Sequence, residues 1–200
     1  IHNGIIENFS ELRAELTSQG VKLQSDTDTE VVAHLLSSIL PTVNNDLAQA
    51  MRQTCIRLRG AFTLVAAHAD LPDLVVGARR NSPLVVGRGQ NENFLASDVS
   101  AFIAHTRNAI ELGQDQVVEL RADSIRVTDF AGKEVPVTEY EVTWDAAAAE
   151  KGGFDTFMLK EISEQPKAVS DTLLGRIKNN RVELDEMNFS ADELRSVNKI

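Results

Sequence analysis

The feature that most constrains the fold of this chain is a succession of short apolar segments separated by turn residues, which begins after Gly60. The segments AFTLVAAHA, DLVVGARR, PLVVGRG and NFLASD are separated by Asp-Leu-Pro, Asn-Ser-Pro and Gln-Asn-Glu-Asn. RNAIEL, QVVEL, SIRVTD and VPVTEYEVT continue the series. Short strands joined by tight turns pair antiparallel, because parallel neighbours need a long crossover. The sequence therefore predicts antiparallel sheet over much of residues 61–143.

Three helices are predicted ahead of this sheet region, because apolar residues recur there at helical spacing. They cover, in chain order, residues 8–20, 27–40 and 45–58. Asn8 is placed to cap the first helix, and Thr27 with Glu30 has the spacing of a capping box at the second. Between these helices, residues 21–24 alternate like a short strand. Helices followed by antiparallel strands predict an α+β fold.

A break in composition follows the sheet region. Residues 145–153 are small and polar and end in two glycines, which is typical of a linker. Residues 160–178 then carry apolar side chains at helical spacing, and Pro166 either begins or kinks that helix. A further short helix is predicted over 191–197. The chain therefore divides into a main domain, a linker and a second segment, at residues 1–144, 145–156 and 157–200.

The composition argues against several kinds of function. The chain of 200 residues has a formal net charge of −10 and no cluster of Lys and Arg, so we expect no binding to nucleic acid. Its apolar runs are strand-sized, so we expect no contact with a membrane, and a cytoplasmic protein is the simplest interpretation. The four histidines lack metal-ligand spacing, so neither a metal nor another cofactor is predicted.

The single cysteine, Cys55, excludes an internal disulfide and a thiolate metal cluster. It lies in a segment with helical spacing, and no neighbour in the sequence is suited to activate it. A nucleophile is one interpretation. An inert thiol packed inside the protein is the favoured one.

The densest cluster of chemically useful groups is HNGIIEN, residues 2–8. Asn3 offers a side-chain amide donor, and Gly4 allows a ligand to approach the backbone closely. Together they could direct two donors at one oxygen, as the oxyanion of an acyl transfer requires. The alternative is a plain Asn-Gly hairpin turn, which the local chemistry alone favours.

A second candidate is SDTDTEV, residues 25–31, at the predicted start of the second helix. Asp26 and Asp28 both suit a helix N-terminus, where a carboxylate interacts favourably with the helix dipole. The functional alternative is that one of the two carboxylates faces outward and binds the ammonium group of a substrate.

These motifs and several others occur in a fixed order along nearly the whole chain. After HNGIIEN come five further matches: TDTEV at 27–31, LRGAF at 58–62, SPLVVG at 82–87, NFLASD at 93–98 and KEISEQP at 160–166. In this order they resemble the isomerising glutamine–fructose-6-phosphate aminotransferase family, also called glucosamine-6-phosphate synthases. The first five fall in its glutaminase domain, and KEISEQP resembles the first helix of its sugar-phosphate isomerase domain.

The resemblance implies an N-terminal-nucleophile hydrolase fold, in which two stacked β-sheets lie between layers of helices (αββα), here incomplete. It also implies that Asn3 and Gly4 form the oxyanion hole and that Asp28 holds the α-ammonium group of glutamine. The family's nucleophile is an N-terminal cysteine, which would lie upstream of Ile1, and Cys55 does not match it. The chain as given is therefore predicted not to hydrolyse glutamine.

For the complete protein, the resemblance implies that ammonia from glutamine passes to fructose 6-phosphate and forms glucosamine 6-phosphate. The site for fructose 6-phosphate would lie outside these residues, and a homodimer would form through the isomerase domain, which residues 157–200 begin. One alternative from another class stays open: a ligand-binding or interaction module that keeps the glutaminase fold without catalysis.

Overall fold

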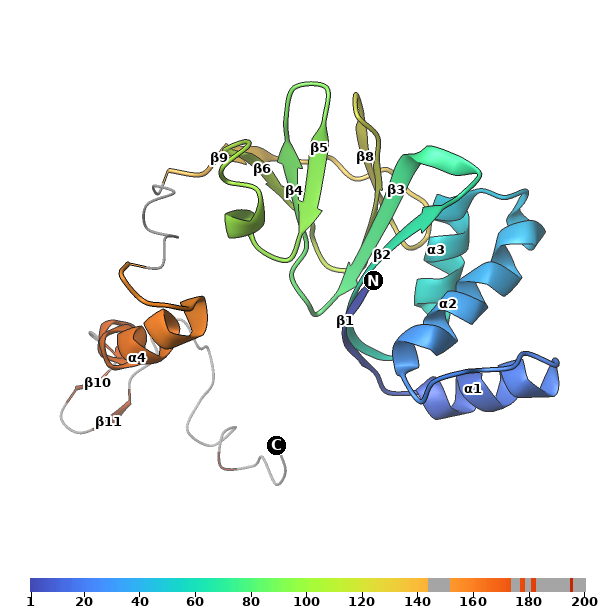
Figure 1. The fold of residues 1–200 in the computed structure, drawn as a ribbon, viewed down its shortest axis with the longest axis horizontal. Coiled ribbons are helices and arrows are strands. Elements are labelled where there is room, and N and C mark those ends of the chain that lie inside the picture. Colours follow the sequence, from blue (N-terminus) through green and yellow to red (C-terminus); the bar gives the residue numbers. More distant parts are fainter. Residues whose placement is uncertain (144–151, 174–176, 179–180, 183–194, 196–200) are drawn as a thin grey trace. The chain divides into compact units, whose positions relative to one another are not determined.

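The computed structural model describes residues 1–143, 152–173, 177–178, 181–182 and 195. The chain forms two compact units, Ile1–Ala146 and Ala147–Ile200 (Figure 1). The predicted linker lies largely among residues that the structure does not describe.

The first unit contains two antiparallel sheets, as the succession of short strands predicts. The larger has the order β1-β2-β3-β7-β8, with strands at His2–Ile6, Gly60–His68, Leu71–Arg80, Gln116–Leu120 and Ile125–Asp129. The smaller has the order β5-β4-β6-β9, with strands at Asn93–Ala96, Val85–Arg88, Asn108–Glu111 and Glu139–Glu141. The last strand is much shorter than the predicted segment VPVTEYEVT.

Three helices precede the sheets, at positions close to those predicted. They are α1, α2 and α3, at Phe9–Ser18, Asp28–Ile39 and Leu47–Arg57. A 3-10 turn, η1, covers Leu40–Val43 and contains Pro41 in its first turn, where a missing N–H costs little. A second one, η2, covers Val99–Ala101.

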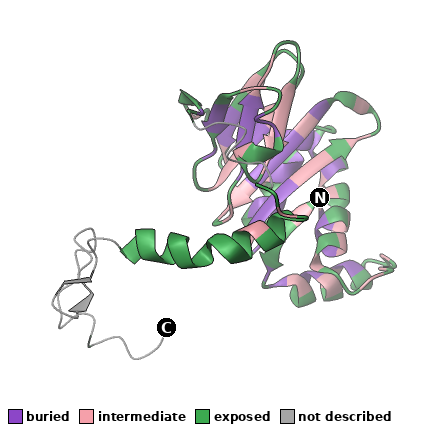
Figure 2. Cartoon of the chain, turned by 60° about the vertical axis from the view of Figure 1, so that its left-hand side comes forward, coloured by how far each residue is buried: buried purple, intermediate pink, exposed green. Residues whose placement is uncertain are grey.

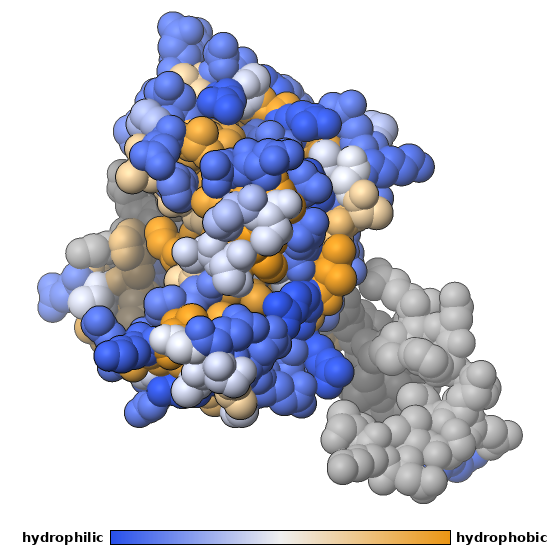
Figure 3. Space-filling view, turned by 90° about the vertical axis from the view of Figure 1, so that its right-hand side faces the viewer, coloured by the Kyte–Doolittle hydropathy of each residue, from blue (hydrophilic) through white to orange (hydrophobic). Residues whose placement is uncertain are grey.

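Two apolar clusters show how these elements are layered. The helices pack on one face of the five-stranded sheet, where Ile6, Leu35 and Met51 share a buried cluster with Phe62 (Figure 2). The other face of that sheet contributes residues such as Val118 to a second cluster with β4 and β6. The surface over the helices is mostly hydrophilic, interrupted by apolar patches (Figure 3). In the described residues the order is therefore helix, sheet, sheet, with only η2 on the outer face of the second sheet.

The predicted strand at 21–24 does not form. Val21 and Leu23 pack against the helical core, and the backbone N–H of Gln24 donates to the Glu30 carboxylate at 2.7 Å. A side chain thus takes the hydrogen bond that a neighbouring strand would have supplied.

Asn8 stands at the N-cap position of α1, as predicted, but it is not a side-chain cap. Its side chain makes no capping hydrogen bond. Instead it donates to the carbonyl of Arg57 at 3.0 Å and accepts from the N–H of Arg59 at 2.9 Å. Asn8 therefore ties the start of α1 to the connection between α3 and β2, far away in the sequence.

The second unit contains helix α4, Phe157–Leu173, and a hairpin of β10 and β11, Ile177–Lys178 and Arg181–Val182. The helix begins three residues before the predicted start, and Pro166 lies inside it. The predicted helix at 191–197 lies outside the described residues except for Arg195. No helix among the described residues is long and apolar enough to span a membrane.

Candidate active site

Strand β1 carries the HNGIIEN motif and forms one edge of the five-stranded sheet in the part of the chain that the structure describes. Ile1 exchanges both backbone hydrogen bonds with Val65, and the N–H of Glu7 donates to Arg59. In an antiparallel pair, every second residue is hydrogen-bonded to the partner strand. The backbone N–H groups of the residues between, which include Gly4, therefore point to the open edge.

The Asn-Gly pair is not a hairpin turn. Asn3 and Gly4 lie in the middle of β1 and pair with Thr63 and Phe62 of β2. Gly4 has a φ of +134°, and a Cβ at this position would lie 2.1 Å from the carbonyl oxygen of Ala61. Only glycine fits both the backbone angle and this close approach of the two strands.

The two faces of β1 differ. The side chain of His2 is only 3% exposed and Ile6 is fully buried, both on the side of the helices. Ile5 is 68% exposed and Asn3 is also exposed. Because side chains alternate along a strand, the Asn3 amide lies on the face opposite His2, away from the helices.

Asp28 meets the same open edge from the side of the helices. It is the first residue of α2, and its Oδ2 accepts the backbone N–H of Ile6 at 2.9 Å. Ile6 is two residues from Gly4, so their N–H groups lie along one edge roughly 7 Å apart. The Asp28 carboxylate and the Gly4 N–H therefore lie along the same open edge of β1.

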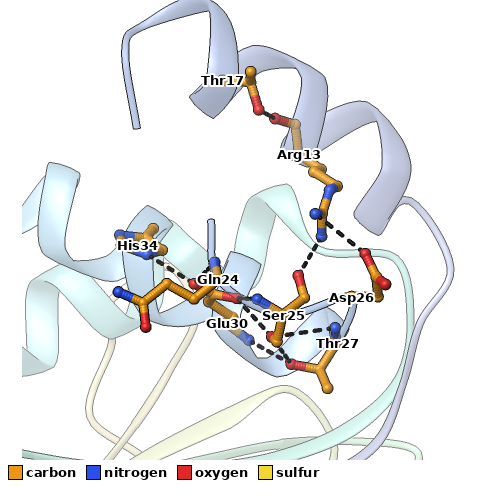
Figure 4. Close-up of polar contacts among 8 residues, drawn as sticks. All are labelled: Arg13, Thr17, Gln24, Ser25, Asp26, Thr27, Glu30 and His34. Carbon is orange, nitrogen blue, oxygen red and sulfur yellow. Dashed lines mark hydrogen bonds and ion pairs between the residues drawn. The ribbon is translucent and has the colours of Figure 1, made fainter. Parts of the chain in front are cut away.

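Side chains of the preceding loop fix the start of α2 (Figure 4). The Thr27 hydroxyl accepts from the N–H of Glu30, as predicted. The Glu30 carboxylate does not complete a capping box with the Thr27 N–H. It accepts from the Ser25 hydroxyl and from the N–H groups of Ser25 and Gln24, at 2.6–2.7 Å. Together these hydrogen bonds lower the pKa of Glu30 to about 2, and the hydrogen bond from the Ser25 hydroxyl makes the largest contribution.

The two candidate aspartates have different surroundings. Asp26 is fully exposed and pairs with Arg13 of α1 at 3.3 Å (Figure 4). The side chain of Asp28 is 23% exposed and faces β1. Of the two carboxylates, only that of Asp28 reaches the strand that carries Asn3 and Gly4.

A cavity with a volume of about 320 Å³ lies between α2, α3 and β2. Its walls are mainly apolar, with His2, Thr29 and His68 among the polar exceptions. Asn3, Gly4 and Asp28 are not part of its lining. The candidate site is therefore an open sheet edge beside this cavity.

Cys55 is fully buried in α3, and burial raises the pKa of its thiol. This confirms that the thiol is packed inside the protein, where the reactive thiolate form is disfavoured. No group of three or more metal-ligating side chains occurs among the described residues.

His2 is the residue of this region that the sequence did not single out. Its side chain reaches Asp28 and Thr29, with Nδ1 at 3.4 Å from Asp28 Oδ1 and 3.1 Å from Thr29 Oγ1. The available signal was its alternation with Ile6, which would have placed it on the buried face of a strand. That signal was missed because residues 2–6 were not predicted to form a strand.

Comparison with known proteins gives a consistent family. Residues 1–104 match the family model of the glutamine amidotransferase domain. Similar curated proteins include those of Streptomyces coelicolor, 65% identical, and Corynebacterium efficiens, 58% identical, each across the whole chain. Both are named glutamine–fructose-6-phosphate aminotransferase [isomerizing]. The chain covers 32% of each, so it spans about a third of the length of these relatives.

A solved structure supports the fold. The glutamine phosphoribosylpyrophosphate amidotransferase of B. subtilis, complexed with ADP and GMP, matches with a TM-score of 0.56. The match covers 65% of this chain and 28% of that one at 23% identity. At this identity the likeness concerns the fold alone.

Proposed function

The chain belongs to the glutamine amidotransferase domain family, and from this premise we propose that residues 1–143 bind glutamine and stabilise the oxyanion formed at its side-chain amide. The proposal rests on one observation above all. The Gly4 N–H and the Asp28 carboxylate lie along the same open edge of β1. The Gly4 N–H can donate to an amide oxygen and the Asp28 carboxylate can bind an ammonium group. The two groups are thus separated by about the length of an amino acid.

The proposed roles divide between binding and catalysis. The α-ammonium group of glutamine binds Asp28, and its amide oxygen accepts from the Gly4 N–H and the Asn3 amide. When a nucleophile attacks the amide carbon, negative charge develops on that oxygen. Donors fixed in advance stabilise this charge more than they stabilise the neutral amide, which lowers the barrier. Asn3 and Gly4 act on the transition state, and Asp28 acts on binding.

The nucleophile comes from outside residues 1–200, because the single cysteine of this chain is buried in α3. Attack on the amide carbon forms a thioester and expels ammonia, and water then releases glutamate. The chain alone is accordingly expected to be inactive.

In the complete protein, the ammonia is transferred to fructose 6-phosphate, the acceptor in the name of the relatives. The acceptor site lies in the isomerase domain that begins at residue 157, and this domain also forms the homodimer. The αββα sandwich is completed by residues other than 1–200, and the protein acts in the cytoplasm without a cofactor.

The test is glutamine hydrolysis by the full-length protein and three variants. Asn3→Ala should lower kcat by about 10²-fold, through the loss of one oxyanion donor. Asp28→Asn should raise the KM for glutamine sharply with a smaller change in kcat, because asparagine can still accept the Ile6 N–H but lacks the charge. Asp26→Asn is the matched control, since that carboxylate faces α1, and it should change neither constant.

Two results would contradict the proposal. If the full-length protein does not release glutamate from glutamine, the chain is a module that keeps the fold without catalysis. If Asp26→Asn and Asp28→Asn have the same effect, the glutamine does not bind at the edge of β1.

A further inference from the structure

The imidazole of His2 is a buried polar group on the edge strand β1. Its side chain is only 3% exposed, although the strand that carries it has an open edge. Burying a polar ring is costly unless its nitrogens are hydrogen-bonded. Nδ1 has partners in Thr29 and Asp28, whereas Nε2 is buried with no hydrogen-bond partner among the described residues. Among the described residues, the contacts of Nδ1 are therefore what offsets the cost of burying the ring.

These contacts indicate which nitrogen carries the proton. If Nδ1 were bare, its lone pair would face the Asp28 carboxylate at 3.4 Å, and a buried Nε2–H would lack an acceptor. With the proton on Nδ1, this nitrogen donates to Thr29 Oγ1 at 3.1 Å and carries its proton 3.4 Å from Asp28 Oδ1, and only an acceptor is left unpaired. The second arrangement avoids a repulsion and an orphaned donor, so we assign the proton to Nδ1.

Asp28 is then held by two residues of β1. Its Oδ2 accepts the backbone N–H of Ile6, and its Oδ1 faces Nδ1 of His2. His2 and Ile6 lie on either side of Gly4, on the same face of the strand. The carboxylate is therefore fixed relative to the residue whose N–H faces the open edge.

We propose that His2 is a positioning residue of the glutamine site, which acts by holding the Asp28 carboxylate in register with the Gly4 N–H. The inference rests on the proposed function, because it concerns the carboxylate that binds the ammonium group of glutamine. His2 itself does not touch the substrate. Its removal frees one oxygen of Asp28 to rotate, and the ammonium group loses a preorganised partner.

The test uses the geometry of the imidazole ring in the full-length protein. Asparagine places its amide nitrogen near Nδ1, whereas glutamine places its amide near Nε2. His2→Asn should keep the KM for glutamine within about threefold of the wild-type value. His2→Gln and His2→Leu should raise it by about tenfold, because a close polar contact with a charged group is lost, with a smaller change in kcat.

A double-mutant cycle separates positioning from a general structural role. If His2 acts through Asp28, His2→Leu should raise KM less than twofold when Asp28→Asn is already present. If His2 merely supports the fold, His2→Leu should raise KM by the same factor in Asp28→Asn as in the wild-type protein. This result would overturn the inference. Equal KM values for His2→Asn and His2→Gln would overturn it as well, and this comparison of two polar variants holds even if His2→Leu fails to fold.

The failure of the two proposals can be distinguished. A wild-type protein that does not hydrolyse glutamine removes the proposed function, and the inference with it. A wild-type protein that hydrolyses glutamine, with a KM that is unchanged in all three His2 variants, removes the inference alone.

Discussion

Replacing Gly4 by alanine tests the close approach of β1 and β2 that places the candidate oxyanion donor. Gly4 has a φ of +134°, and an added Cβ would lie 2.1 Å from the carbonyl oxygen of Ala61. Real Cβ atoms essentially never come within 3.0 Å of such an atom, so one strand must move by roughly 1 Å. The obstructing atom belongs to the backbone, so no change of side-chain rotamer can relieve the overlap.

Two terms contribute to the cost, and Gly20 separates them. Alanine at a φ that L-residues rarely adopt costs about 1–3 kcal/mol, and the steric overlap adds about 1–3 kcal/mol. Gly20, after α1, also has a positive φ of +89°, but nothing lies within 4 Å of a Cβ there. Gly20→Ala therefore carries the first term only, and Gly4→Ala should be the less stable variant by at least about 1 kcal/mol.

The measurement is chemical denaturation of the full-length protein, combined with hydrogen exchange of the β1 and β2 amides. Exchange should accelerate more in Gly4→Ala than in Gly20→Ala. Because a displacement of about 1 Å can cost about 10²-fold in rate, kcat for glutamine should fall in Gly4→Ala alone. Equal stability and equal exchange in the two variants would refute the reasoning about the close approach.

Two further predictions concern side chains that order the helices. Asn8→Ser should lower the free energy of unfolding by about 2–3 kcal/mol. Serine can cap a helix, but its side chain is too short to bond both the carbonyl of Arg57 and the N–H of Arg59. A loss below about 0.5 kcal/mol in urea denaturation would favour simple capping. Glu30 has a folded-state pKa of about 2, below its ordinary 4.5, so its stabilisation is complete above about pH 4.5 and is lost as the pH falls through 2. Glu30→Gln should therefore flatten the fall of stability over this range in an acid titration, and parallel curves for the two proteins would contradict this.

The elements that the sequence predicts well are those defined by local periodicity. Their apolar residues recur at a spacing that fits one kind of secondary structure only. This holds for the helices at Asp28–Ile39 and Leu47–Arg57 and for the central strands. β1 escaped prediction because Asn-Gly is a strong local turn signal. Its strand conformation comes from pairing with β2, more than fifty residues away, which no local pattern reveals.

The same distinction applies to the candidate site. The resemblance singled out Asn3, Gly4 and Asp28, and the local chemistry left each with a plainer interpretation. For Gly4 the turn interpretation is wrong, because the backbone angle serves a strand pair. The contact between Asp28 and Ile6 joins two elements that only the folded chain brings together, as does the contact with His2.

A carboxylate that is already hydrogen-bonded to its own protein can still bind a substrate, and Asp28 shows why. An ionised carboxylate offers about four lone-pair sites, and the Ile6 N–H and the His2 ring occupy at most two of them. The side chain is 23% exposed, so part of it remains accessible. The N-terminus of α2 further favours a negative charge at this position. In the proposed role of Asp28, an ammonium group is therefore added without displacing either contact, and the contacts that limit the motion of Asp28 lower the entropy cost of binding.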